Sequence, residues 1–203
     1  IEVMIANFLF GKVLILNSGY YAERLIKIAN DYKKTHKYIK KIDVLDWKKY
    51  ENINRKYDWI IFCYTETSLG LKLPLKKIYD VAKKFNSKIM LDATASFGLE
   101  KYHEYADVFS YSSCKGLFGL TGASFISFDS LPSNKIESFN LNINSHLNKK
   151  MTGPYHAIYS LDLVLKNHSD FLYSVKINKK KFMQLAGKNL SIQKNLQPLI
   201  CTQ

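Results

Sequence analysis

Cysteine is scarce in this 203-residue chain, and the chain has no long apolar run. The three cysteines, Cys63, Cys114 and Cys201, are an odd number at wide spacing, which argues against a disulfide framework or a zinc site and fits a reducing cytoplasm. No stretch approaches the ~18 consecutive apolar residues of a membrane-spanning helix. Residues 1–4 also lack the basic start of a signal peptide. We therefore expect a cytoplasmic protein with no membrane partner and no bound metal.

Arginine is the second residue in short supply. The formal net charge is +13, from 30 lysines and arginines against 17 acidic residues, and a charge of this size invites a nucleic-acid partner. However, Arg24 and Arg55 are the only arginines, whereas base readout and bidentate phosphate contacts favour arginine over lysine. The lysines are scattered along the chain rather than clustered. We interpret them as a solvated surface and predict no specific nucleic-acid partner.

Short apolar runs alternate with helical patterns along the chain, which is 47% hydrophobic and long enough for one substantial core. The runs expected to form strands are 13–16, 59–64, 89–91, 108–111 and 123–128, with a weaker one at 42–45. Helices are expected over 1–9, 21–32, 73–85, 154–165 and 173–186. We expect residues 140–150 to be irregular and 196–202 to form a strand. Alternation of strands and helices predicts an α/β fold with a parallel sheet and right-handed crossovers.

The residues with the clearest chemical meaning lie in the stretch 88–128. Its first apolar run ends at Asp92, and its second is followed by Lys115, 23 residues later, in a glycine-rich loop. Open α/β sheets bind ligands at the carboxyl ends of their strands. A lysine amine there can form a Schiff base, and a buried aspartate can hold a protonated pyridine nitrogen, as pyridoxal phosphate requires. Alone, Asp92 would be read as a helix cap and Lys115 as a surface lysine; their combination favours the cofactor site.

Five stretches of the chain resemble, in order and with compatible spacing, motifs of the class V (fold type I) aminotransferases, which depend on pyridoxal phosphate. The stretches are NSGYYAER at 17–24, TETSLG at 65–70, DATASFG at 92–98, SSCKGLFGLTG at 112–122 and MTGPYH at 151–156. The subgroup most similar to the chain is 2-aminoethylphosphonate–pyruvate transaminase, whose Ser-Leu-Ser-Leu-Asp-Leu stretch resembles residues 138–143. Alanine–glyoxylate and serine–pyruvate transaminases are close relatives of that subgroup.

The resemblance implies a domain organisation. Residues 1–165 would form the large, cofactor-binding domain of fold type I without its N-terminal part, with a mostly parallel sheet and flanking helices. Residues 166–203 would form a connecting helix and the start of a C-terminal small domain. Because enzymes of this family are nearly twice as long, we expect the chain to be truncated at both ends, without the family's Ser-Gly-Thr phosphate turn and its arginine for the substrate carboxylate.

The resemblance also implies roles for individual residues. Lys115 would hold pyridoxal phosphate as a Schiff base and then move a proton on the substrate. Asp92 would pair with the pyridinium nitrogen, Thr67 would lie near the phenolic oxygen, and Thr94 would lie against the ring. Thr152 matches a residue that reaches the cofactor phosphate of a neighbouring subunit, which implies a homodimer.

The predicted function is transfer of an amino group from a small amine, best matched by 2-aminoethylphosphonate, to pyruvate or a similar 2-oxo acid. An alanine–glyoxylate or serine–pyruvate type of aminotransferase stays open, as does a catalytically impaired remnant. Departures from the family pattern keep the remnant open, since Cys114 replaces an Asn or Gln, and Thr121 and Gly153 replace prolines. Cys114 is interpreted as a small replacement and not as a nucleophile, because a reactive thiol needs an activating neighbour.

Overall fold

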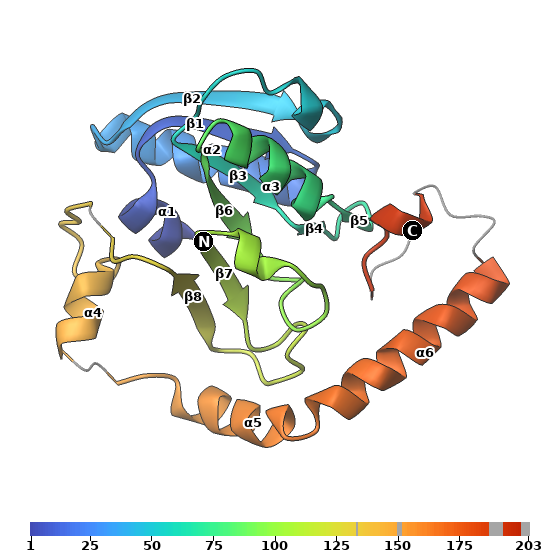
Figure 1. The fold of residues 1–203 in the computed structure, drawn as a ribbon. Coiled ribbons are helices and arrows are strands. Elements are labelled where there is room, and N and C mark those ends of the chain that lie inside the picture. The colour runs from blue at the N-terminus through green and yellow to red at the C-terminus, as the bar shows by residue number, and fades with distance from the viewer. Residues whose placement is uncertain (133, 150–151, 187–192, 200–203) are drawn as a thin grey trace.

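The computed structural model describes residues 1–132, 134–149, 152–186 and 193–199, and its centre is a six-stranded sheet (Figure 1). The strand order is β2-β1-β3-β6-β7-β8. The strands are β1 (Gly11–Asn17), β2 (Ile39–Asp46), β3 (Trp59–Cys63), β6 (Lys88–Asp92), β7 (Val108–Ser112) and β8 (Ser124–Phe128). All neighbours are parallel except β7 and β8, which are antiparallel. The predicted α/β fold with a mostly parallel sheet is confirmed.

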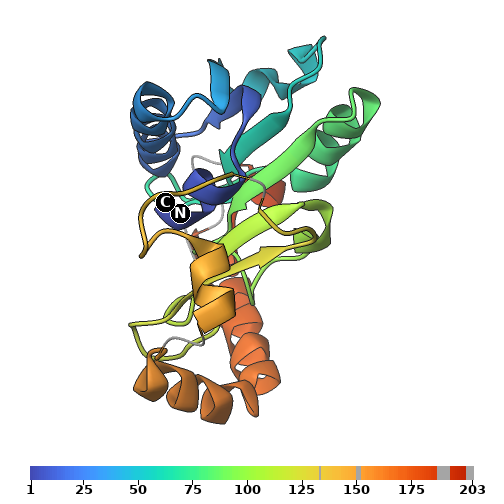
Figure 2. The ribbon, with the colours of Figure 1, turned by 90° about the vertical axis from the view of Figure 1, so that its left-hand side faces the viewer.

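Helices cover both faces of this sheet. Helices α1 (Glu2–Phe8) and α2 (Tyr20–Thr35) pack on one face, and α3 (Leu75–Lys84) packs on the other. The remaining helices are α4 (Ile143–Lys149), α5 (Tyr155–Leu165) and α6 (His168–Ala186), and the last two lie beyond the β8 edge of the sheet (Figures 1 and 2). The short elements are the hairpin strands β4 (Thr65–Glu66) and β5 (Leu71–Lys72) and the 3-10 helices η1 (Trp47–Asn52), η2 (His103–Tyr105) and η4 (Lys194–Leu196). No helix of the described residues is long and apolar enough to cross a bilayer.

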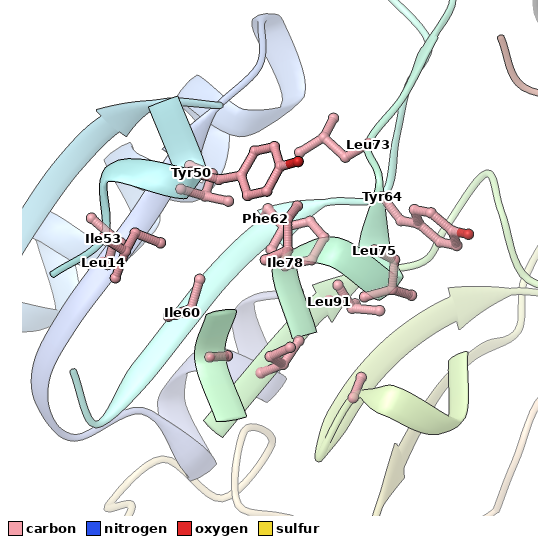
Figure 3. Packing of buried hydrophobic residues seen from close by; sticks show 14 of the residues in the cluster. Leu14, Tyr50, Ile53, Ile60, Phe62, Tyr64, Leu73, Leu75, Ile78 and Leu91 are labelled. Atoms are coloured by element: carbon pink, nitrogen blue, oxygen red, sulfur yellow. The ribbon is translucent and has the colours of Figure 1, made fainter. Parts of the chain in front are cut away.

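Both faces of the central strands are buried, which explains their continuous apolar sequences. Because successive side chains of a strand point to opposite faces, Phe62 and Leu91 pack with Ile78 of α3 (Figure 3). Ile61 and Met90, one residue earlier on each strand, belong to the core under α1 and α2. A strand buried on both faces reads as an unbroken apolar run, and for that reason the sequence located these strands correctly.

Shortening a side chain of this core is expected to lower stability modestly. Ile60 is fully buried in the cluster under α3, so Ile60→Val should lower the free energy of unfolding by about 0.5–1.5 kcal/mol. Urea unfolding would show a lower midpoint with an unchanged slope. Ile26→Val removes the same methylene from a partly buried position on α2 and serves as the matched control, with a smaller expected loss. Equal losses at the two sites would contradict this account of the core.

Helix α4 departs from the prediction that residues 140–150 are irregular. Asn142 lies directly before the helix, and its side-chain oxygen accepts a hydrogen bond from the Ser145 N–H at 3.3 Å. The buried Asn7 of α1 accepts a hydrogen bond from the Ile143 N–H at 3.1 Å. Asparagine is unfavourable in the interior of a helix but favourable at its start. The prediction of an irregular segment was wrong because it considered only the low propensity of asparagine for helix interiors.

The C-terminal part differs in a similar way. The strand predicted over 196–202 is wrong for its described part, because Leu196 ends the 3-10 helix η4 and residues 197–199 form no strand; residues 200–202 lie outside the described residues. The helix predicted over 173–186 begins earlier, at His168. The weak strand predicted at 42–45 is the longer β2, which pairs along β1. Pairing with a buried neighbour extends a strand whose own sequence is polar.

Candidate active site

The candidate site lies where the chain changes direction across the sheet. From β1 the chain passes to β2 on one side and then to β3 on the other, so β1 and β3 flank a topological switch point. A cavity of about 210 Å³ opens there, beyond the carboxyl ends of the strands. Of the residues predicted to bind a cofactor, Asp92, Lys115, Thr67 and Thr94 all line it. Thr152 does not line it and is exposed on the segment before α5.

Asp92 is the last residue of β6, which is hydrogen-bonded to β3 and β7 on its two sides. The residue is 7% exposed. Its carboxylate oxygen Oδ1 accepts a hydrogen bond from the Thr94 N–H at 2.9 Å. Among the described residues, nothing donates a hydrogen bond to the other oxygen, Oδ2. Asp92 therefore orders the turn that follows it and keeps one oxygen for a ligand in the cavity.

Lys115 belongs to a loop that is closed by its own backbone. Ser113 is fully buried, and its backbone carbonyl accepts a hydrogen bond from the Gly119 N–H at 2.8 Å. The hydroxyl of Ser113 lies 2.6 Å from the Leu120 carbonyl, to which it donates. The Lys115 carbonyl accepts from the Phe118 N–H at 3.0 Å. This loop presents the lysine side chain to the cavity from a backbone that is held at both ends.

Two glycines allow the loop of Lys115 to touch the turn that follows Asp92. Gly98 has a φ of +87°, and a Cβ atom there would lie 2.6 Å from the Gly116 carbonyl oxygen. A Cβ atom on Gly116 would lie 2.1 Å from the carbonyl oxygen of Phe97. Both distances are far below a normal contact. The two loops therefore meet backbone to backbone, and this contact fixes the position of Lys115 relative to Asp92.

Helix α6 also holds this loop. Nε2 of His168 lies 2.9 Å from the Gly116 carbonyl oxygen, and because a carbonyl only accepts, the ring donates from Nε2. The ring of Phe118 packs against the rings of His168 and Phe171 at centroid distances of 5.6 and 5.8 Å. The first turn of α6 is thus bound to the backbone carbonyl of Gly116, the residue that directly follows Lys115.

The turn after β3 connects the cavity to helix α2. Thr65 and Thr67 line the cavity, and the hydroxyl of Thr65 is buried without a hydrogen-bond partner among the described residues. Glu66 between them is fully buried and points to the start of α2. Its carboxylate accepts hydrogen bonds from the backbone N–H groups of Tyr21, at 3.1 Å, and Ala22, at 3.2 Å. A carboxylate in this position stabilises the first turn of a helix.

Two cavity residues of α2 were missed by the sequence analysis. Tyr21 was interpreted as a packing or surface residue and Arg24 was given no role in the site, although both belong to the family-like stretch 17–24; both line the cavity. They lie three residues apart at the start of a helix, so they share one face. The usable signal was the glycine before them, since Gly19 has a φ of +141° and approaches Glu66 closely. The contact itself joins residues 45 positions apart, which no local pattern shows.

A second cavity of about 340 Å³ adjoins the first, and Lys115 lines both. The two share Thr65, Thr67, Ala95 and Lys115. The rest of the second lining is mostly apolar, and includes Leu99, Phe118, Pro198, Leu199 and the half-buried Cys114. Its carboxylate, Glu100, is held by the Lys72 ammonium at 2.9 Å and the Leu199 N–H at 2.7 Å. Together the cavities fall in the range of about 300–1,000 Å³ that small-molecule sites occupy.

Comparison with known proteins places this geometry in context. No family model matches the chain. A 2-aminoethylphosphonate–pyruvate transaminase of Rhizobium meliloti (strain 1021) is 25% identical over 191 residues, which cover 83% of this chain and 49% of that protein. The chain spans between a fifth and about half of the length of the curated transaminases that it matches.

Solved structures match over nearly the whole chain. The pyridoxamine–pyruvate aminotransferase of Mesorhizobium loti superposes with a TM-score of 0.79 at 16% identity, over 98% of this chain and 59% of that one. The alanine–glyoxylate aminotransferase of Nostoc sp. gives a TM-score of 0.77 at 19% identity, over 98% and 61%. The chain has the α/β fold of fold type I aminotransferases. At these identities the likeness concerns the fold, and the chemistry depends on the site itself.

The cysteine nearest Asp92 is not poised to react. Burial raises the pKa of the Cys63 thiol well above its usual value, and the negative charges of Asp92 and Glu66 add to this effect. The thiol therefore stays protonated and lies 3.2 Å from the Thr65 carbonyl oxygen, to which it donates. Because the thiolate is the nucleophilic form, Cys63 is interpreted as part of the cavity wall. Among the described residues, no three His, Cys, Asp or Glu side chains are grouped to hold a metal ion.

Acid is expected to destabilise the protein through His103, which lies beneath the turn that follows Asp92. The ring is 8% exposed, and Nε2 lies 2.9 Å from the hydroxyl of Ser96. Burial lowers the pKa of His103 to about 4. This pKa is below the value of about 6.5 that a histidine has in the unfolded chain. The neutral His103 ring therefore contributes fully to the free energy of unfolding above about pH 6.5, and this contribution, up to about 3 kcal/mol, is lost as the pH falls through 4.

Urea unfolding at pH 7.0, 5.5 and 4.5 measures this effect. The free energy of unfolding should fall between pH 6.5 and 4, and His103→Gln, which keeps a hydrogen-bonding group near Ser96, should flatten the dependence. His36→Gln, at a half-buried position after α2, is the control and should keep the wild-type dependence. Equal pH profiles for the wild type and His103→Gln would contradict the assignment.

Proposed function

We propose that the chain forms the cofactor-binding part of a pyridoxal-phosphate-dependent aminotransferase. The observation that carries this proposal is the pairing of Asp92 and Lys115. Asp92 ends β6, Lys115 follows the neighbouring parallel strand β7, and both line one cavity at the switch point of the sheet. A carboxylate with an uncommitted oxygen and a lysine amine in one cavity are the donor set that this cofactor requires. The unpartnered hydroxyl of Thr65 in the same wall adds a polar group that a ligand can satisfy.

Each residue of the cavity has a distinct task in this proposal. When bound, pyridoxal phosphate supplies a reactive carbonyl carbon and a ring that withdraws electrons. Asp92 would hold the protonated ring nitrogen with its carboxylate, one oxygen of which is hydrogen-bonded to the Thr94 N–H. Lys115 would hold the cofactor through its amine and would move a proton at the substrate carbon. Thr67 and Thr94 position the ring from the walls of the cavity.

The substrates proposed are a small amine, with 2-aminoethylphosphonate preferred, and pyruvate or a similar 2-oxo acid. Support comes from the similarity to 2-aminoethylphosphonate–pyruvate transaminases, which would place the protein in phosphonate metabolism. An alanine–glyoxylate type of transamination is the alternative, and a neighbour in fold carries that name. We further propose a cytoplasmic enzyme in which residues 1–165 form the large domain and residues 166–203 begin a small one.

The proposed assembly is a homodimer in which Thr152 reaches the cofactor phosphate of the neighbouring subunit. Thr152 is exposed and lies outside the cavities of its own chain, so it is available to a second copy. The helix that follows it, α5, carries the exposed apolar side chains Ile158, Tyr159 and Leu163. Contiguous exposed apolar side chains commonly mark a contact surface. Sedimentation equilibrium of the protein tests the assembly.

Borohydride reduction tests the cofactor assignment directly. The purified protein is incubated with pyridoxal phosphate, reduced, digested and mapped by mass spectrometry. We expect a phosphopyridoxyl group on Lys115 and none at that site in Lys115→Ala. An unmodified Lys115 in folded wild-type protein would remove the aminotransferase proposal and leave the impaired remnant in its place. With the cofactor bound, mixing with 2-aminoethylphosphonate, alanine or serine and following the cofactor absorbance identifies the amino donor.

A further inference from the structure

Arg24 is a cationic group of the cavity that the cofactor assignment does not use. It lies in the second turn of α2 and lines the cavity together with Tyr21 and Leu25, which are on the same face of the helix. The backbone of this helix start is fixed by the Glu66 carboxylate through the Tyr21 and Ala22 N–H groups. The direction of Arg24 toward the cavity is therefore set by the same contact that holds the turn of Thr65 and Thr67.

The two arginines of the chain differ in their partners. Arg55 donates to the Asp43 carboxylate at 3.0 Å and to the Tyr57 hydroxyl at 2.9 Å. In the described part of the chain, Arg24 has no hydrogen bond, and no carboxylate lies within 4 Å of its guanidinium. Asp92 lines the same cavity but forms no ion pair with Arg24. The N–H groups of the Arg24 guanidinium are thus available to a group that enters the cavity.

The charges of the cavity lining favour an anion. Its side chains carry the positive charges of Arg24 and Lys115 against the single negative charge of Asp92. In the proposed function Asp92 would pair with the ring nitrogen and Lys115 would hold the cofactor, so Arg24 is the cationic side chain of this lining to which no partner has been assigned. A guanidinium presents a planar fork of N–H groups that matches the oxygen atoms of phosphate, phosphonate and carboxylate groups.

We propose that Arg24 binds an oxyanion group of the ligand that reaches Lys115. The chemistry is that of a phosphate, phosphonate or carboxylate group, and it has two possible sources, the cofactor or the substrate. The identity of the ligand rests on the proposed function, whereas the affinity of the cavity for an oxyanion is measured without it. This assigns a ligand contact to a residue outside the group Asp92, Lys115, Thr67, Thr94 and Thr152.

The first experiment measures oxyanion binding by the purified protein without cofactor. Inorganic phosphate, methylphosphonate and acetate are titrated against the wild type and against Arg24→Gln, Arg24→Lys and Arg55→Gln, with the unfolding midpoint as the readout. We expect at least one anion to stabilise the wild type and Arg55→Gln, and Arg24→Gln to bind it about 10- to 100-fold more weakly, as the loss of a charged hydrogen bond predicts. Arg24→Lys should lie between them, because it keeps the charge and loses the fork.

The second experiment separates the two sources. If the cofactor supplies the anion, Arg24→Gln weakens binding of pyridoxal phosphate but not of pyridoxal. If the substrate supplies it, KM rises for 2-aminoethylphosphonate but not for ethanolamine, an amine donor without an oxyanion group, at saturating cofactor. Either result supports the inference. Anion affinities in Arg24→Gln equal to those of the wild type would overturn it, even where Lys115 is labelled. An Arg24-dependent anion site in a protein whose Lys115 stays unlabelled would uphold it and reject the aminotransferase proposal alone.

Discussion

Replacing Lys115 with alanine is expected to lower the rate of the proposed amino transfer by about 10²- to 10⁴-fold, the contribution of a positioned general acid–base group. The loss of covalent attachment adds to this effect. The stability of the protein should change little, because Lys115 is exposed within its loop and the loop is held by the backbone of Ser113. Stopped-flow measurement of the half-reaction with each amine donor reports the rate.

The control for this variant is Lys76→Ala, which removes an exposed lysine from α3 on the far side of the sheet from α1 and α2. It should retain the wild-type rate. Chemical rescue sharpens the test, since methylamine can take over proton transfer at a site that has room for it. Retention of more than a tenth of the wild-type rate in Lys115→Ala would show that this lysine does not move the proton.

Asp92→Asn is expected to reduce the rate by about 10²- to 10³-fold, the size of effect found when one preorganised electrostatic group is removed. The substitution is nearly isosteric, and the Asn side-chain oxygen can still accept from the Thr94 N–H. The fold should therefore survive, while the negative charge that keeps a ring nitrogen protonated is lost. The cofactor absorbance spectrum and its pH dependence would report this change together with the rate.

Asp107 provides the matched control for Asp92, because it lies near the opposite end of β6. Its carboxylate accepts a hydrogen bond from the Ile89 N–H at 2.8 Å and lines no part of the first cavity. Asp107→Asn should alter stability slightly and leave the rate and the spectrum unchanged. A full rate in Asp92→Asn, or equal losses in the two variants, would contradict a specific role for the Asp92 charge.

The strands of the sheet were predicted well because each can be identified from its own short stretch of sequence. The central strands are buried on both faces, so their composition alone identifies them. Asp92 and Lys115 were predicted to lie at one edge of the sheet because the carboxyl ends of parallel strands meet there. In the structure both residues line one cavity. Their roles toward a cofactor stay predictions. Helix α4 was missed because its asparagines were considered only by their low propensity for helix interiors, and because one contact at its start comes from Asn7, a residue more than 130 positions away.

The cavity wall on α2 was missed for a similar reason. The buried carboxylate of Glu66 holds the start of α2 through a contact between distant parts of the sequence. This contact helps to place Tyr21 and Arg24 at the cavity. The contact between Gly98 and Gly116 could not be predicted either. The sequence does not show whether a glycine is present for its turn conformation or because another backbone approaches it closely.

The hydrogen bond from His168 to the Gly116 carbonyl has a mechanical consequence. Helix α6 has 19 residues and is therefore about 28 Å long. One end of this helix is hydrogen-bonded to the residue after Lys115, while the other end lies away from the sheet (Figure 1). A displacement of α6 along its axis would therefore move the backbone that carries Lys115, although no residue of α6 is among those that line the two cavities.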